Sequence, residues 1–316
     1  MLPHLTTILF LLLLLCSCDS YFEPECPDTD EKTVLYCMPS PDTDTVLIQL
    51  SRSVPLSSSG TPPKGIPGAD IDFRINGTLH PVQWNEKATP SLPAECYYVC
   101  SHVNEGDRIE IMASTDGIAP VSAFTVIPPP FPLNHISFGL KPGISPQLQI
   151  RINFTDDASS VDYYGVRVCR MNVSGADSTE TVLKPGLTDE PLLNHKVGID
   201  ATFDLDYNYY QDLYIWSDEQ VQGKEYTLRL NVDYIPDTPE ESGQAASGEK
   251  HLYKVALYTL SSELYHYLKS VNDISNNELG QNGLAPIRSH YTNITNGFGV
   301  LGGCQYYDSG WLSPHL

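Results

Sequence analysis

The sequence has few basic residues: 18 Lys and Arg stand against 39 Asp and Glu, which gives a formal net charge of -21. A chain with this excess of negative charge is repelled by the phosphates of nucleic acid and by anionic lipid. Nucleic acid is therefore excluded as a main partner, and so is an anionic lipid surface. The ordinary reason for such an acidic surface is solubility beside an anionic cell envelope.

The N-terminal apolar run is too short to cross a membrane. Ile8–Cys16 has nine residues, whereas a helix that spans a bilayer needs roughly 20. This length suits the apolar region of an export signal. The run continues into Leu15-Cys16-Ser17-Cys18, the Leu-x-Ser-Cys pattern of a bacterial lipoprotein signal. We therefore expect a signal peptide at 1–17 and lipidation of Cys18, with several acyl chains that hold the protein stably on its membrane.

The segment before the apolar run contains no Lys or Arg. A second interpretation therefore stays open, in which a secretory signal is cleaved elsewhere and Cys18 is an ordinary disulfide cysteine. Three acidic residues follow it closely: Asp19, Glu23 and Glu25. They resemble the surface-export signal of Bacteroidetes lipoproteins. We expect a lipid-anchored protein of the cell outer membrane, exposed at the surface, with residues 18–32 as an acidic tether.

Helical patterns are scarce, while 19 tyrosines and 25 prolines favour strands joined by stiff connections. Seven short β patterns fall within residues 33–127, and Asn76-Gly77 between two of them signals a tight hairpin. They predict an immunoglobulin-like β-sandwich. The Pro-rich segment 128–134 predicts a stiff joint, and a second β-rich domain follows over 135–316. The expected fold class is all-β, mainly β, with two β-sandwich-like domains.

One helix is expected in the second domain, over residues 262–271. Ser261 is suited to cap it, and Glu263 lies in the first turn, where the helix dipole favours a carboxylate. One side carries an apolar stripe: Leu260, Leu264, Leu268 and Val271. This amphipathic helix should therefore pack on the sheet of the second domain.

The cysteines lack the spacing of a zinc site, because the chain has no Cys-x-x-Cys and no His-x3-His near its cysteines. Beyond Cys18, the six cysteines of the mature chain are Cys26, Cys37, Cys96, Cys100, Cys169 and Cys304. Six cysteines allow 15 full pairings, and their spacing does not choose among them. Cys96 and Cys100 would lie about 13 Å apart on one strand, at ~3.3 Å per residue, which is too far for a bridge between them. We expect no metal and no cofactor.

Motifs of catalysis are also missing: there is no Gly-x-Ser-x-Gly and no His-Glu-x-x-His. Gly297–Gly302 matches the dinucleotide-binding pattern but lacks the following helix and the acidic residue about 20 positions further on that this pattern requires, so it predicts a backbone-crowded turn near the C-terminus. Asp204–Asn208 starts like a calcium loop, yet Tyr209 and Ile215 stand where an EF-hand has Gly and Glu. A solvated acidic loop is the expectation there, and a calcium site of another kind stays open.

The candidate ligand-binding residues form an aromatic cluster: Tyr207, Tyr209, Tyr210, Tyr214 and Trp216. Tyr and Trp are favoured at recognition surfaces because they bury a large area at small cost in side-chain entropy. They are also ordinary strand residues. Packing in the core is therefore the alternative interpretation of this cluster.

Several segments carry a resemblance to a known family: the lipoprotein signal ending at Cys18, Leu50–Pro55, the joint after Ile127, Trp216–Glu219, Gly223–Thr227, Glu263–Lys269 and Asn293–Gly302. In this order they resemble Bacteroidetes outer-membrane lipoproteins of unknown function, the domain of unknown function four-two-four-nine. The six cysteines depart from the pattern of that family, so no pairing is carried over. No catalytic residue is carried over either.

The resemblance implies genes that lie beside TonB-dependent outer-membrane transporters. The leading hypothesis is therefore a non-enzymatic accessory or substrate-capturing partner of such a transporter in nutrient uptake. A structural or adhesive surface module is the alternative. A third hypothesis is a hydrolase with a spatially assembled site, which requires a nucleophile and a base within hydrogen-bond reach in a deep pocket.

Overall fold

The structure is a computed structural model that describes residues 31–54, 64–143, 146–194, 207–237, 249–277 and 289–314. The expected signal peptide, the lipidated Cys18, Cys26 and residues 204–206 lie outside these ranges, as does most of the tether. Residues 32–316 make up one compact unit. Among the described residues, no helix is long and apolar enough to span a membrane.

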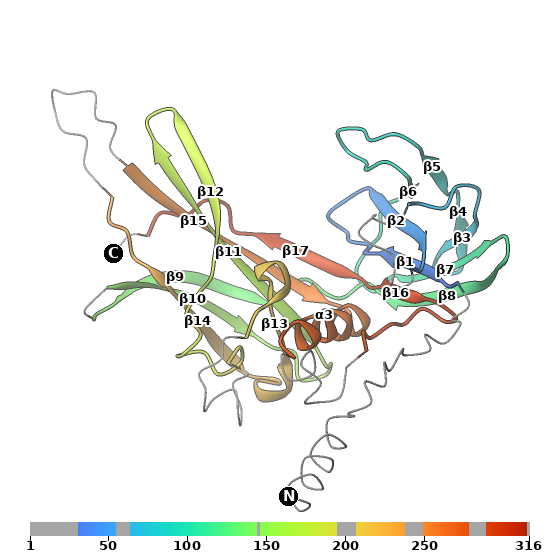
Figure 1. The fold of residues 1–316 in the computed structure, drawn as a ribbon. Helices are drawn as coiled ribbons and strands as arrows, with labels where there is room; N and C mark the ends of the chain where they lie inside the picture. The colour runs from blue at the N-terminus through green and yellow to red at the C-terminus, as the bar shows by residue number, and fades with distance from the viewer. Residues whose placement is uncertain are drawn as a thin grey trace, which may run out of the picture. The chain divides into compact units, whose positions relative to one another are not determined.

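Strands dominate the described chain, which confirms the all-β class (Figure 1). Two antiparallel sheets are built mainly from its first third. Sheet A has the order β16-β1-β2-β6-β5, from β16 (Phe298–Leu301), β1 (Thr33–Cys37), β2 (Thr45–Arg52), β6 (Cys96–Cys100) and β5 (Gln83–Asn85). Sheet B has the order β4-β3-β7-β8, from β4 (Thr78–His80), β3 (Asp70–Ile75), β7 (Arg108–Thr115) and β8 (Ile118–Val126). β16 alone joins sheet A in parallel.

Alternation along the strands explains how sheets A and B bury a shared core. On β7, Ile109 and Ile111 are buried while Glu110 and Met112 face outward, because successive side chains of a strand point to opposite faces. The inward residues of both sheets belong to one apolar cluster. The hairpin signal is confirmed too, since Asn76 and Gly77 both have positive φ, +49° and +80°, as the tightest hairpin turns require.

Two further sheets enclose a second core. Sheet C has the order β14-β10-β9, from β14 (Glu225–Asp233), β10 (Gln147–Thr155) and β9 (Leu133–Lys141). Sheet D has the order β12-β11-β15-β17, from β12 (Asp177–Leu183), β11 (Tyr163–Ser174), β15 (Glu249–Leu260) and β17 (Cys304–Asp308), and β13 (Tyr214–Ser217) also pairs with β11. Short 3-10 turns flank β13: η1 (Tyr210–Asp212) and η2 (Asp218–Gln220). Phe131 of the Pro-rich segment packs in this core.

The expected helix is present as α3 (Ser262–Ser275), which begins where it was predicted to begin. The Ser261 hydroxyl accepts the backbone N–H of Leu264 at 3.3 Å. The helix runs four residues beyond the predicted end at Val271, because tertiary contacts hold the last turn. Asn272 is 2% exposed and its side-chain oxygen accepts the backbone N–H of Tyr210 at 2.7 Å. Asp273 pairs with Lys269 one turn earlier.

The C-terminal segment serves both cores. β16 pairs in parallel with β1, so Val34 lies opposite Phe298, and β17 then pairs with β15 (Figure 1). Leu301 is fully buried in the core of sheets A and B, while its neighbour Val300 is buried in the core of sheets C and D. Residues placed by the sequence in the second domain thus complete a sheet of the first.

The glycines of Gly297–Gly302 lie against backbone. A Cβ on Gly299, where φ is +101°, would overlap the Leu35 carbonyl oxygen, and one on Gly297 would lie 2.6 Å from the Thr33 oxygen. The predicted crowding is therefore confirmed. The prediction of a turn was wrong, since most of the motif is strand β16. The backbone of β16 can approach β1 this closely because glycine has no side chain.

Cysteines of the described chain occur as thiols: Cys37, Cys96, Cys100, Cys169 and Cys304. Cys37, Cys96 and Cys169 are buried. The Cys96 thiol donates to the Pro93 carbonyl oxygen at 3.1 Å. The pairing of the cysteines therefore stays open.

Candidate functional site

A cavity of about 540 Å³ lies where α3, β1, β15 and η1 meet. Its aromatic wall is made by Tyr36, Tyr210, Tyr258 and Tyr267, and its polar tips are Gln49, Gln211, His290 and Cys304. Aliphatic side chains fill the space between them. The volume lies within the usual range of small-molecule sites, about 300–1,000 Å³.

Helix α3 supplies one wall of this aromatic cavity. Its apolar stripe, from Leu264 through Leu268 to Val271, lines the cavity together with Leu260 just before the helix. These residues share one side because positions three or four apart are neighbours on a helix. Only Leu264 of the three helix residues is fully buried. The stripe therefore packs on the core at its N-terminal end and faces the cavity beyond it.

A tyrosine pair joins the helix to the first strand across the cavity wall. The Tyr267 hydroxyl donates to the Tyr36 hydroxyl at 3.3 Å, and the two rings meet edge to face with centroids 6.0 Å apart. Burial, and then the hydrogen bond to Tyr36, raise the pKa of Tyr267 well above its ordinary value. Tyr267 is therefore an uncharged phenol at neutral pH. Its hydroxyl offers a hydrogen bond without a charge.

None of the described residues that line the aromatic cavity is Asp, Glu, Lys or Arg, although the chain carries 18 basic and 39 acidic residues. Burial raises the pKa of the Cys304 thiol to about 11. At neutral pH this group is therefore a thiol rather than the thiolate that acts as a nucleophile. The arrangement is suited to hold an uncharged molecule and has no activated group at Cys304.

Three buried carboxylates meet where β10 ends, β11 begins and β13 ends. Asp156, Asp162 and Asp218 each bring an oxygen within 4.8 Å of the other two. All three are at least nine-tenths buried. Hard cations such as Ca²⁺ prefer carboxylate oxygens. Among the described residues, this acidic cluster is the group suited to hold a divalent cation.

The acidic cluster is also a set of structural hydrogen bonds. Asp156 accepts from the Tyr164 hydroxyl at 2.7 Å and from the Gly223 N–H at 2.8 Å. Asp218 accepts the N–H of Asp162 at 2.8 Å. Burial, with a further contribution from the neighbouring carboxylates, raises the pKa of both Asp162 and Asp218. These bonds hold the loops around β11, β13 and β14 together, at the cost of mutual repulsion.

The family described as Domain of unknown function (DUF4249) matches residues 19–309. The chain belongs to this family. The match includes every described strand and the helix of this DUF4249 protein, and so confirms the resemblance to this domain family. That the protein is a Bacteroidetes outer-membrane lipoprotein stays a prediction. No curated protein matches the chain.

Of the five aromatic residues predicted to bind a ligand, Tyr210 alone lines the cavity of this DUF4249 protein, and it is 50% exposed. Tyr209, Tyr214 and Trp216 are buried in the core of sheets C and D, and Tyr207 packs against that core. The Tyr209 hydroxyl donates to the Leu193 carbonyl oxygen. Their role in ligand binding stays a prediction, and the structure gives each of the three buried residues a packing role.

Other cavity residues carried little signal in the sequence. Tyr36 and Tyr267 are 231 residues apart, and no local pattern relates them. The helix stripe was the one usable signal, because its spacing marked a face of α3 that must be covered. The acidic cluster was missed for the same reason as the tyrosine pair. The pairing of β11 with β13 brings Asp162 beside Asp218, and contacts with Tyr164 and Gly223 bring Asp156 to them.

A serine and a histidine lie within reach of each other in the first sandwich: the Ser101 hydroxyl is 3.2 Å from His80 Nδ1. Neither residue lines the aromatic cavity. In the part of the chain that the structure describes, no carboxylate is hydrogen-bonded to the His80 ring. A hydrolytic triad needs such a group to orient the base, so this pair gives the hydrolase hypothesis only two of its three parts.

Proposed function

We propose that this DUF4249 protein is a non-enzymatic surface lipoprotein that captures an uncharged, largely apolar small molecule and delivers it to a TonB-dependent transporter. One observation carries the binding part of the proposal. Among the described residues, the wall of the cavity of about 540 Å³ contains four tyrosines and no Asp, Glu, Lys or Arg, within a chain of net charge -21.

The chemistry of the wall selects the ligand. Burying an unpaired charge in apolar surroundings is costly, so organic ions are disfavoured. Tyrosine rings offer flat apolar faces, and apolar area removed from water contributes about 25 cal/mol per Å². The hydroxyls of Tyr36 and Tyr267 and the amide of Gln49 provide a few polar contacts. A neutral molecule with a cyclic or aliphatic body and one or two hydroxyl or carbonyl groups fits this set.

The cellular part of the proposal rests on the sequence. The Leu-x-Ser-Cys pattern at Cys18 predicts the lipid anchor, and the resemblance noted for the family implies the transporter. An anchored binding protein needs no enzymatic group, because capture raises the concentration of the nutrient beside the transporter. Two experiments test the two parts separately.

Binding is tested with N-phenyl-1-naphthylamine, an uncharged fluorescent probe, and the full mature chain. We expect saturable binding that Leu268→Glu weakens at least tenfold, because the variant places a charge in the aromatic cavity. Ser262→Glu is the matched control, since Ser262 is exposed on the same helix. Circular dichroism melts check that both variants fold. Equal affinity for wild type and Leu268→Glu would refute the cavity as the binding site.

The partner is tested by purification from detergent-solubilised outer membranes. We expect the wild-type lipoprotein to bring down a large barrel protein, and Cys18→Ala to lose both palmitate labelling and this partner. Recovery of the labelled lipoprotein alone would contradict the transporter proposal. It would leave the binding result unaffected.

A further inference from the structure

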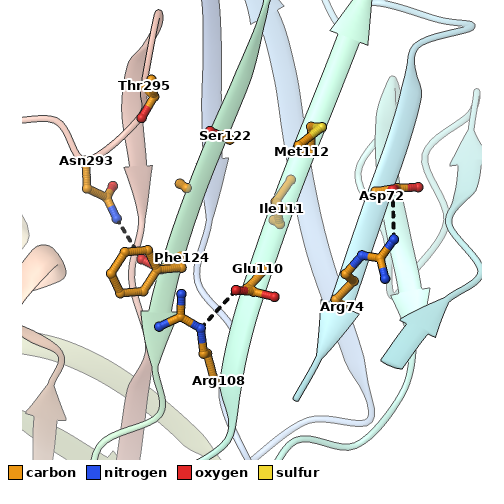
Figure 2. Close-up of a pocket in the computed structure, with 11 residues that line it drawn as sticks. Asp72, Arg74, Arg108, Glu110, Ile111, Met112, Ser122, Phe124, Asn293 and Thr295 are labelled. Carbon is orange, nitrogen blue, oxygen red and sulfur yellow. Dashed lines mark hydrogen bonds and ion pairs between the residues drawn. The ribbon is translucent and has the colours of Figure 1, made fainter. Parts of the chain in front are cut away.

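A second hollow, of about 380 Å³, lies on the outer face of sheet B (Figure 2). Side chains of strands β3, β7 and β8 line this hollow. The segment around Thr295 borders the hollow next to β8, because Thr295 forms an isolated β-bridge with Ser122. Unlike the aromatic cavity, this outer hollow contains charges: Asp72, Arg74, Arg108 and Glu110. Its chemistry therefore differs from that of the proposed nutrient site.

Arg108 is held in a fixed orientation in the outer hollow. Its guanidinium carbon lies 4.0 Å from the centre of the Phe124 ring. Its Nε donates to Glu110 Oε1 at 2.9 Å. Within the described chain, no hydrogen bond or ion pair engages its two terminal nitrogens. Figure 2 shows these nitrogens on the side of the guanidinium away from Glu110.

The other arginine of the outer hollow is engaged differently. Arg74 Nη2 donates to Asp72 Oδ2 at 3.2 Å, and Nη1 donates to the Gly77 carbonyl oxygen at 3.3 Å. Both of its terminal nitrogens therefore have partners. Among the described residues, the terminal nitrogens of Arg108 have no hydrogen-bond partner, unlike those of Arg74.

We propose that the outer hollow binds the carboxylate of a small organic acid. The two terminal nitrogens of Arg108 donate hydrogen bonds to the two carboxylate oxygens. A planar guanidinium matches a carboxylate in this bidentate geometry. The apolar body of the acid lies against Phe124 and Met112, whose large side chains are 50% and 57% exposed. Ser122 and Thr295 stand beyond Phe124 from Arg108 (Figure 2) and offer hydroxyls to the far end of the ligand.

Local charge balance makes the site compatible with an acidic chain. Each carboxylate in the outer hollow is already paired with an arginine, so the incoming anion meets no unpaired negative group there. Repulsion from more distant acidic residues is screened beyond about 8 Å at physiological ionic strength. The guanidinium of Arg108 decides the preference for an anion.

The test compares benzoate with benzamide, its uncharged analogue of the same shape, by titration of the mature chain in solution NMR or calorimetry. We expect benzoate to bind at least about tenfold more tightly, as one hydrogen-bonded charge pair implies. Arg108→Met should abolish this preference. Arg108→Lys should keep the charge but weaken benzoate binding several-fold, because the fork is lost. Arg151→Met removes the same charge from exposed Arg151 of sheet C and should leave benzoate affinity unchanged.

Two results would overturn the proposal. Equal binding of benzoate and benzamide would show that the apolar wall acts without the guanidinium. Benzoate binding that survives Arg108→Met would place the acid elsewhere. Because the Arg108 side chain is 47% exposed, both Arg108 variants are expected to fold, and a melt of each verifies this. The outcome is independent of the aromatic cavity.

Discussion

Replacing Asp218 by Asn removes one charge from the acidic cluster while keeping its hydrogen bond. The Asn oxygen remains able to accept the N–H of Asp162, which Asp218 accepts now at 2.8 Å. The carboxylate oxygens lie within 4.8 Å of one another. At an effective dielectric constant of about 20, two unit charges at this distance repel by about 3 kcal/mol. We therefore expect Asp218→Asn to increase the free energy of unfolding at neutral pH by about 1–3 kcal/mol.

The pH dependence follows from the direction of the shifts. Burial and the neighbouring carboxylates raise the pKa of Asp162 and Asp218 in the folded chain, so between the unfolded pKa of about 3.9 and the raised value the folded state binds more protons. The stability of the wild type therefore falls as the pH rises through this window. In Asp218→Asn, residue 218 carries no charge and so does not add to the repulsion among the buried carboxylates. The advantage of Asp218→Asn over the wild type should vanish toward pH 4 and increase as the pH rises through the raised pKa.

Urea titrations and thermal melts from pH 4 to pH 8 measure this difference. Asp157→Asn is the control, because Asp157 is exposed and hydrogen bonds from Ser159 lower its pKa, so it should give no gain at neutral pH. Loss of stability in Asp218→Asn at pH 7 would refute the repulsion argument. Millimolar CaCl₂ that stabilises the wild type but not Asp218→Asn would show a cation site instead.

Three further substitutions test the C-terminal segment and the helix by chemical denaturation. Gly299→Ala should cost at least about 2 kcal/mol, because φ is +101° and the new Cβ overlaps the Leu35 oxygen. Leu301→Ala should cost about 2–5 kcal/mol, as its side chain is fully buried; an unchanged midpoint in either variant would contradict the pairing of β16 with β1. Ser261→Ala should cost about 1 kcal/mol through loss of the helix cap, and Ser261→Asp should restore most of it.

Features that depend on neighbouring residues were predictable from the sequence. Ile109 and Ile111 alternate with outward residues because a strand has a period of two, and the structure buries both. The cap at Ser261 follows from the need of a helix end for an acceptor. The family resemblance was confirmed over residues 19–309. The lipid anchor at Cys18 and the transporter partner stay predictions.

The sequence by itself determined the strand-rich class, the hairpin at Asn76-Gly77 and the start of the helix, because each depends on residues a few positions apart. Only the tertiary structure decided that β16 lies beside β1, that Tyr36 meets Tyr267, and that the three carboxylates converge. Such contacts join segments dozens to hundreds of residues apart. They are selected by the burial of whole sheet faces, a property that no local pattern of side chains contains.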